Sequence, residues 1–234
     1  MKLRAGTSGY AFKEWRGVFY PEDIKADAML GFYASKFPSI EINNTFYRLP
    51  KESVLEDWAS QVPDDFRFTI KASRRITHNS RLKADCEETV GYLLKNTAVM
   101  GEKMGPILFQ LPPNLKKDVE RLKVFLGFLP EDRRYTFEFR HESWWDEDTF
   151  SALRDRNVAM TISEQAELSC PVVCTADWGY LRLHKLDYDP AALAAWAKTV
   201  GEQKWEDVYV YFKHDEGEGS GPPAVENFVA ACGK

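Results

Sequence analysis

Ionisable side chains fall at the ends of several short apolar runs, and their types are those used in acid–base and covalent catalysis. Glu41 and Glu138 could form an acid–base pair, because burial can keep one carboxyl group protonated while a second stays ionised. Lys71 is an alternative nucleophile, through a Schiff base with a carbonyl substrate. His184 or His141 could carry a proton. These residue types predict a hydrolase or a lyase.

Cationic groups accompany these candidates. Arg140 and Arg182 could hold an anion, because guanidinium groups pair well with carboxylates and phosphates. The segment Lys71–Lys83 contains three arginines, two lysines and no acid, which indicates a positive loop beside the site. The further ligand contacts expected at the ends of apolar runs are Asn43, Gln110 and Lys213. The ligand is expected to be a small phosphorylated or carboxylated molecule.

Aromatic residues make up 14% of the chain, more than a core of this size needs. Tyr10 and Trp15 lie in the loop after the first apolar run, and flat rings beside a polar pocket suit the face of a sugar. We therefore expect both rings to contact the ligand, which could also be a sugar-containing molecule.

Three other interpretations stay open. The charged residues could form an ion-pair network that only closes the fold. Arg140 shares a strand face with Glu138, which counts against acid catalysis, because Arg140 would keep that carboxylate ionised and unsuited to donate a proton. The second interpretation is that the protein binds nucleic acid in the manner of an endonuclease barrel, using its basic loop and exposed rings. The third interpretation is a small-molecule sensor without catalysis.

Composition limits these choices. The 234 residues carry a formal net charge of −5, which disfavours a protein that coats nucleic acid by bulk charge. Four cysteines and four histidines show no zinc-site or paired-histidine spacing, so we expect neither a metal nor another cofactor. No apolar stretch reaches the length of a membrane span, and the first residues lack a signal peptide. A cytoplasmic protein without a membrane partner is expected.

The elements that must position these residues alternate between strands and helices. Eight β-rich runs begin about 29 residues apart on average, which is the length of a β–α unit, and amphipathic helical patterns fill most of the gaps. The gap after the sixth run, between Glu164 and Trp178, has little helical pattern. We predict an α/β fold: one closed (β/α)8 barrel domain over residues 1–234, with a weak or missing helix after strand 6. The predicted runs are Leu3–Ser8, Ser39–Asn44, Arg67–Ala72, Pro106–Leu111, Tyr135–Arg140, Val158–Ser163, Tyr180–His184 and Asp207–Lys213.

Six ordered motifs between Arg4 and about Asn227 give the chain a family resemblance. It resembles the YecE-like domain-of-unknown-function family, number seventy-two. That resemblance implies a TIM-barrel fold and no settled activity. The chain departs from the usual family pattern at Lys185 and at Lys213, which both add positive charge. The motifs are Gly6–Gly9 with Trp15 and Phe19–Pro21, Glu41–Tyr47, Lys71–Ala72 with Ile76–His78, Gln110–Pro113, Glu138–His141 with Ser143–Trp144, and Tyr180–His184.

Overall fold

All eight apolar runs form strands in the computed structural model, which describes residues 1–165, 168–185, 187–213 and 220–233. The sixth run is divided into two strands by Thr161, and a short strand that the sequence did not predict follows it. The strands are β1 (Lys2–Thr7), β2 (Ser39–Ile42), β3 (Arg67–Lys71), β4 (Met104–Gln110), β5 (Tyr135–Glu138), β6 (Ala159–Met160), β7 (Ile162–Gln165), β8 (Leu168–Ser169), β9 (Gly179–Leu183) and β10 (Asp207–Phe212).

The predicted helices are also present, and local sequence explains where they begin. Asp146 caps α5 by accepting a hydrogen bond from the Thr149 amide at 3.1 Å, and Pro190 opens α6 behind the cap residue Asp189. No helix occurs among the described residues between β7 and β9. The helices are α1 (Met29–Lys36), α2 (Glu52–Ser60), α3 (Glu87–Thr97), α4 (Val119–Gly127), α5 (Glu147–Arg154), α6 (Pro190–Gly201) and α7 (Pro222–Ala231).

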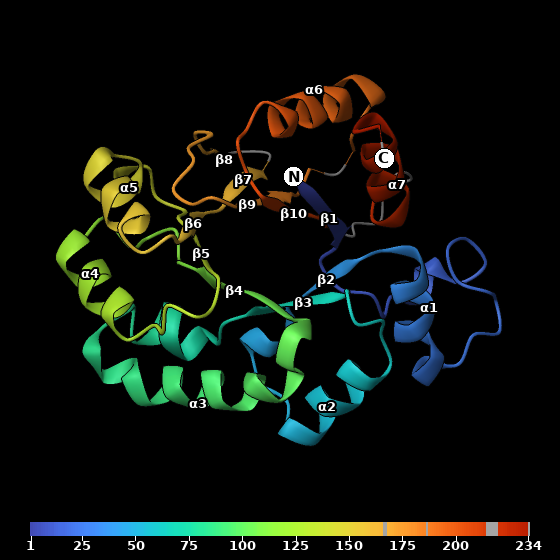
Figure 1. Ribbon diagram of the computed structural model, residues 1–234, viewed down its shortest axis with the longest axis horizontal. Helices are drawn as coiled ribbons and strands as arrows, with labels where there is room; N and C mark the ends of the chain where they lie inside the picture. The colour runs from blue at the N-terminus through green and yellow to red at the C-terminus, as the bar shows by residue number, and fades with distance from the viewer. Residues whose placement is uncertain (166–167, 186, 214–219, 234) are drawn as a thin grey trace.

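The prediction of one closed eight-stranded barrel is wrong. The strands form two sheets of five, in the orders β1-β10-β9-β7-β8 and β2-β3-β4-β5-β6. Every pairing is parallel except that of the β7–β8 hairpin, as expected for strands joined by crossover helices. The fold is thus an α/β arrangement of two parallel sheets, in which the helices lie outside the strands (Figure 1).

Two interruptions of the hydrogen-bond ladder separate the sheets. Between β1 and β2 the backbone pairing is reduced to an isolated bridge between Ser8 and Glu41, beyond the end of β1. On the other side, the chain changes sheets at Thr161, whose amide donates to the Phe137 carbonyl at 2.8 Å before β7 pairs with β9. A closed barrel needs an unbroken ladder around its whole circumference, and these two places do not provide it.

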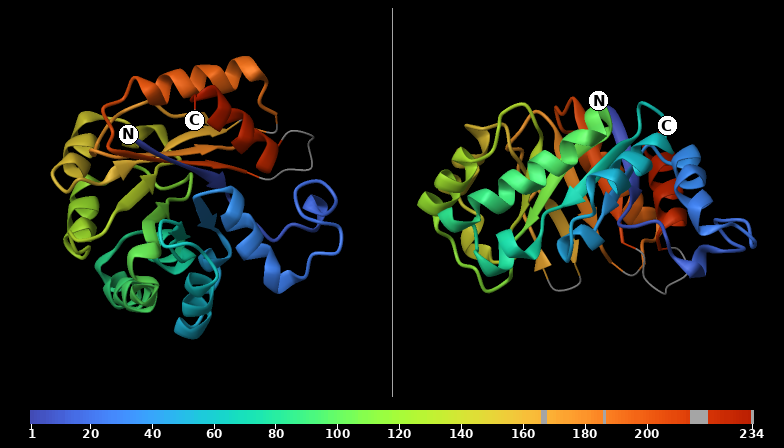
Figure 2. Two further views of the ribbon diagram at one scale, coloured as in Figure 1. Left: turned by 45° about the vertical axis from the view of Figure 1, so that its right-hand side comes forward. Right: turned by 90° about the horizontal axis from the view of Figure 1, so that it is seen from below.

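The two sheets nevertheless face a shared interior. The hydroxyl groups of Tyr211 in β10 and Thr69 in β3 lie 2.9 Å apart, and both residues are fully buried. One apolar core cluster contains Val210 from the first sheet and Ile40 from the second. The segment between β1 and α1 projects away from this core (Figure 2). No helix in the described part of the chain has both the length and the apolar character needed to cross a membrane.

Candidate functional site

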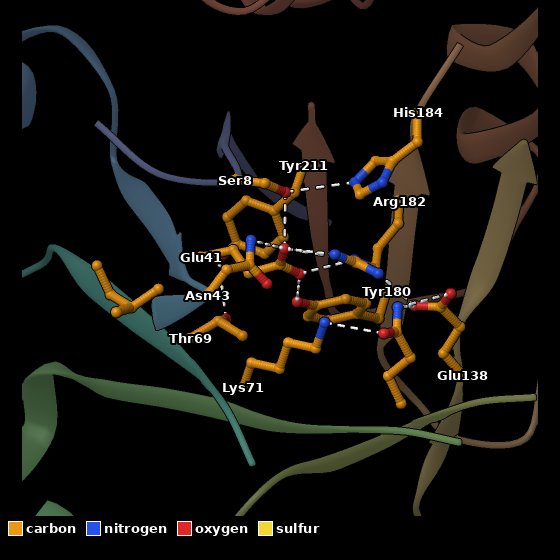
Figure 3. Close-up of polar contacts among 12 residues, drawn as sticks. Ser8, Glu41, Asn43, Thr69, Lys71, Glu138, Tyr180, Arg182, His184 and Tyr211 are labelled. Atoms are coloured by element: carbon orange, nitrogen blue, oxygen red, sulfur yellow. Dashed lines mark hydrogen bonds and ion pairs between the residues drawn. The ribbon is translucent and has the colours of Figure 1, made fainter. Parts of the chain in front are cut away.

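Strand alternation brings the predicted polar residues together between the two sheets. Leu181 and Leu183 of β9 pack in the apolar core, so Tyr180 and Arg182 point to the opposite side of that strand. Figure 3 shows Arg182 lying between Glu41 from β2 and Glu138 from β5. Three charged side chains that are far apart in the sequence therefore meet between the two sheets, where they are closed off from solvent.

Arg182 joins the two carboxylates. Its Nη2 donates to Glu41 Oε1 at 3.0 Å and its Nε donates to Glu41 Oε2 at 3.0 Å, while its Nη1 donates to Glu138 Oε2. Both glutamates have no exposed surface, and Arg182 is only 3% exposed. The three residues form a buried triad with one net negative charge.

Further donors surround Glu41. The Ser8 hydroxyl donates to Oε1 at 2.6 Å and the Tyr180 hydroxyl donates to Oε2 at 2.5 Å. Burial alone would raise the pKa of Glu41, but the charge of Arg182 and the hydrogen bonds from Ser8 and Tyr180 lower this pKa to about 2. Glu41 is therefore ionised at neutral pH.

Glu138 is held in the same way. Gln110 Nε2 donates to both carboxylate oxygens, at 3.0 and 2.9 Å, and Arg140 Nε donates to Oε1 at 3.0 Å. Burial would raise the pKa of Glu138, but Arg182 and Arg140 outweigh it and hold this pKa well below its usual range. The geometry thus supports the objection that Glu138 is unsuited to donate a proton, and it extends the objection to Glu41.

Lys71 occupies a different environment at the end of β3. Its amine donates to Gln110 Oε1 at 2.8 Å and lies 4.5 Å from the centre of the Phe46 ring. The residue is half-buried. Burial, and then the charge of Arg182, lower the pKa of Lys71 to about 8, although Glu41 and Glu138 oppose them. A substantial fraction of this amine is therefore uncharged near neutral pH.

The histidines have separate surroundings. His184 Nε2 lies 3.3 Å from the Ser8 hydroxyl; burial, and then Arg182, lower the pKa of His184 to about 3, so this ring is neutral. His141 Nδ1 instead accepts a hydrogen bond from the Ser143 amide at 3.2 Å and caps a short helical turn. That contact gives His141 a local structural role. Lys213 is exposed at the end of β10, and its charge also lowers the pKa of His184.

Tyr10 and Trp15, the two aromatic residues expected to contact the ligand, lie in different surroundings. Trp15 is 5% exposed and packs against Phe12, with ring centres 4.7 Å apart, so its ring belongs to the core of the projecting segment. Tyr10 lines a cavity of about 260 Å³ at the ends of β1 and β2. The other residues around this cavity include Ser8, Phe12, Asn43, Asn44 and Trp58.

Asn43 connects this cavity to the buried triad. Its Nδ2 donates to Glu41 Oε1 at 3.0 Å, whereas its buried Oδ1 accepts no hydrogen bond from the described residues. A buried amide oxygen without a partner is uncommon, because it loses its bonds to water without replacement.

Several residues at the site were not among the predicted contacts. Tyr180 could have been found, because it lies two positions before Arg182 and shares its strand face. Phe46 and His78, whose ring centres lie 4.9 Å apart, come from loops, where no periodicity predicts orientation. Among the residues that the structure describes, no group of three or more His, Cys, Asp or Glu side chains is arranged to hold a metal ion.

Comparison with known proteins shows the family. Residues 4–234 match the family described as "Protein of unknown function DUF72". UPF0759 protein YunF of Bacillus subtilis is 24% identical over 220 residues, which cover 85% of this chain and 75% of YunF. UPF0759 protein YecE of Escherichia coli K12 is 33% identical over 114 residues, and the match spans only 48% of this chain and 42% of YecE.

Solved structures share the fold. A DUF72 family protein of Thermotoga maritima superposes with a TM-score of 0.82 at 24% identity, covering 100% of both chains. A DUF72 family protein of Enterococcus faecalis gives a TM-score of 0.84 at 17% identity, covering 99% of this chain and 96% of the other. The family expected from the sequence motifs is confirmed: this chain belongs to the DUF72 family.

Proposed function

We propose that the protein is a lyase or hydrolase that binds a small anionic carbonyl compound and uses the Lys71 amine as its nucleophile. The observation that carries this proposal is the position of the Lys71 amine, which is half-buried, bonded to Gln110 and beside the Phe46 ring, in surroundings that lower its pKa to about 8. Compared with an ordinary lysine, this shift increases the uncharged fraction at pH 7 on the order of a hundredfold.

The surrounding charges suit an anionic substrate. Glu41 and Glu138 share Arg182, and Glu138 also pairs with Arg140, so two cations balance the two buried carboxylates. Arg140 is half-buried and the Lys71–Lys83 segment adds exposed cations, which favour an anionic group on the substrate. Both glutamates then act by positioning Arg182 and Gln110, and neither has to donate a proton.

The covalent step needs the amine, the carbonyl group and one proton from solvent. The nitrogen of uncharged Lys71 attacks the carbonyl carbon, and a C–N bond forms while the carbonyl π bond breaks. A proton moves from nitrogen to oxygen to give a neutral carbinolamine. Its hydroxyl group then takes a proton from solvent and leaves as water, and an iminium ion remains. The iminium can accept the electron pair of a neighbouring bond as it breaks, which is lyase chemistry.

The cavity lined by Tyr10 and Asn43 supports recognition of a larger, sugar-like part of the substrate. The Tyr10 and Trp58 rings in its lining offer flat apolar surfaces, which suit the face of a sugar. The short helix Asn44–Phe46 connects this cavity with the ring that contacts Lys71.

Reductive trapping tests the proposal. Pyridoxal 5′-phosphate, an anionic aldehyde, is incubated with the protein and reduced with borohydride, and the modified lysines are identified by mass spectrometry. We expect Lys71 to be labelled faster than Lys83, an exposed lysine of the same basic segment, by about tenfold or more at pH 7. The Lys71 rate should rise as pH increases and level off above about pH 8, because the uncharged amine is the reactive form.

Matched variants separate nucleophilicity from charge. K71R keeps the positive charge and should abolish trapping at this position, whereas K83R should leave Lys71 labelling unchanged. R140Q should slow labelling by pyridoxal 5′-phosphate more than labelling by pyridoxal, which lacks the phosphate group. Equal labelling of Lys71 and Lys83 by pyridoxal 5′-phosphate in the parent protein would contradict the proposal.

A further inference from the structure

Four arginines surround a second cavity, at the opposite ends of the strands from Lys71. The cavity has a volume of about 410 Å³, and its lining includes the first residues of β3, β4 and β10. Ligands of parallel α/β sheets usually bind at the carboxyl ends of the strands, so a charged cavity at the amino ends needs its own explanation. The arginines are Arg4, Arg67, Arg133 and Arg134.

Only one of these arginines has a carboxylate partner among the described residues. Arg134 Nη1 lies 2.5 Å from Asp207 Oδ2, and its guanidinium also packs 5.4 Å from the Trp178 ring. In the described part of the chain, the other three form no ion pair within 4.0 Å. Their positive charge is therefore not compensated by direct pairing.

Backbone carbonyl groups hold the three unpaired guanidinium groups in place. Arg4 Nη1 donates to the Asp65 carbonyl at 2.7 Å, and Arg67 Nη1 donates to the carbonyl of Asp64 at 2.9 Å. Arg133 Nη1 donates to the Leu94 carbonyl at 3.2 Å. Each bond orients a planar group that has five N–H donors, so further donors are left for a ligand.

Within the described part of the chain, Arg4 is a buried cation that lacks both a counter-charge and a partner for one of its donors. It is 4% exposed, and its buried Nε has no hydrogen-bond partner among the described residues. Burying a guanidinium group without a counter-charge is costly, and so is leaving a buried donor unpaired. Its stabilising neighbours are a carbonyl group and the Tyr209 ring, whose centre lies 5.9 Å from Arg4 Cζ. An anion in the cavity would supply the missing counter-charge.

We propose that this cavity, at the amino ends of the strands, is an anion-binding site that takes a phosphate group. The lining contains four arginines and the three acids Glu102, Asp132 and Asp207, so it has a net positive charge in a chain whose net charge is −5. Asp207 is already paired with Arg134, and the other two acids are exposed at the rim. Phosphate suits the remaining guanidinium groups because its oxygens accept paired N–H donors.

Calorimetric titration with inorganic phosphate at constant ionic strength tests this site, with chloride as the competing anion. We expect R67Q and R133Q each to weaken phosphate binding by about tenfold. D132N should strengthen it several-fold, because the exposed carboxylate repels the anion. R16Q makes the same charge change at an exposed position outside the cavity and should bind phosphate like the parent protein.

The Lys71 site offers a competing location for the same anion, so K71M is included. Phosphate binding that survives K71M and falls in R67Q supports the inference. Binding that disappears in K71M and is unchanged in R67Q and R133Q would overturn it, as would binding no stronger than that of chloride. Circular dichroism establishes that each variant is folded; Arg67 is half-exposed, so R67Q can report on the site even if R133Q fails to fold.

Discussion

Arg182 is the residue on which the charge balance of the interior depends. It is the cation that contacts both buried glutamates, and it comes from the sheet opposite to theirs. The same guanidinium group lowers the pKa of Lys71 and of His184. The arginine that joins the two sheets is thus also one of the groups that lower the pKa of the amine in the proposed Lys71 site.

R182Q should be strongly destabilising, because it leaves two buried carboxylates without their shared cation. We expect the free energy of unfolding at pH 7 to fall by about 3–5 kcal/mol, measured by urea denaturation. R140Q is the matched control: Arg140 is half-buried and its Nε donates to Glu138 Oε1 at 3.0 Å, so a loss of about 1 kcal/mol is expected. Equal effects of the two variants would contradict this role of Arg182.

The difference in the free energy of unfolding between R182Q and the parent protein should depend on pH. The folded-state pKa of Glu41, about 2, lies below its unfolded value, so the stabilisation is complete above about pH 4.5 and is lost as pH falls towards 2. Without Arg182, burial favours the protonated carboxyl groups in the folded state. The difference in unfolding free energy should therefore narrow between pH 5 and pH 3; a constant difference would contradict the assigned charge states.

At the scale of elements, the close approach of β1 to β2 decides where the two sheets meet. Gly6 lies in β1 next to this interruption, and a Cβ atom at Gly6 would lie 2.1 Å from the Ser39 carbonyl oxygen of β2. The obstructing atom belongs to the backbone, so it cannot move aside as a flexible side chain could. Glycine at this position lets β1 come close to β2, and Ser8, which directly follows β1, reaches Glu41.

G6A should therefore destabilise the protein by about 3 kcal/mol, since overpacking against fixed backbone forces the two strands apart. G91A is the control: Gly91 lies in α3, and a Cβ atom there has no neighbour within 4 Å. Alanine is the better helix former, so G91A should raise the free energy of unfolding by about 0.5–1 kcal/mol. Thermal and urea denaturation measure both values, and a neutral G6A would exclude a tight β1–β2 approach.

At the scale of the whole molecule, polar contacts and core packing link the two sheets. Arg182 and Tyr180 from one sheet donate hydrogen bonds to Glu41 from the other. The hydroxyl groups of Tyr211 and Thr69 also form a hydrogen bond between the sheets. The proposed Lys71 site lies at the carboxyl ends of the strands and the proposed phosphate site at the amino ends. An acidic chain thus presents a local concentration of positive charge at each end of its sheets.

Because the sheets share these contacts, we predict that they unfold together as one cooperative domain. Far-ultraviolet circular dichroism, which reports on helices, and tryptophan fluorescence should give the same urea midpoint. Buried tryptophans lie on both sides, since Trp144 follows β5 and Trp178 precedes β9. Two separate midpoints would show that each sheet forms its own domain.

Much of the local structure could be predicted from the sequence, because local periodicity determines it. The alternation of Tyr180, Leu181, Arg182 and Leu183 is enough to place the polar pair on one strand face and the leucines in the core. The capping residue Asp146 likewise marks the start of α5. These signals depend on neighbours within a few residues, and the structure agrees with them.

Trp15 shows where such local inference fails. Its loop is rich in aromatic residues and follows a strand, which favoured a ligand contact, but its ring is covered by Phe12, Phe19 and Tyr20 from its own segment. Burial depends on how the loop folds on itself, and no repeating pattern in the sequence reports that.

The sequence by itself determined the family, the alternating elements and which residues of one strand share a face, since each follows from motifs or from short-range periodicity. The tertiary structure alone decided that the strands form two sheets, that both glutamates are sealed around one arginine, and that Lys71 remains half-exposed. Those features depend on contacts between segments far apart in the chain: Glu41 and Arg182 are 141 residues apart. Only the folded backbone fixes the distance between them.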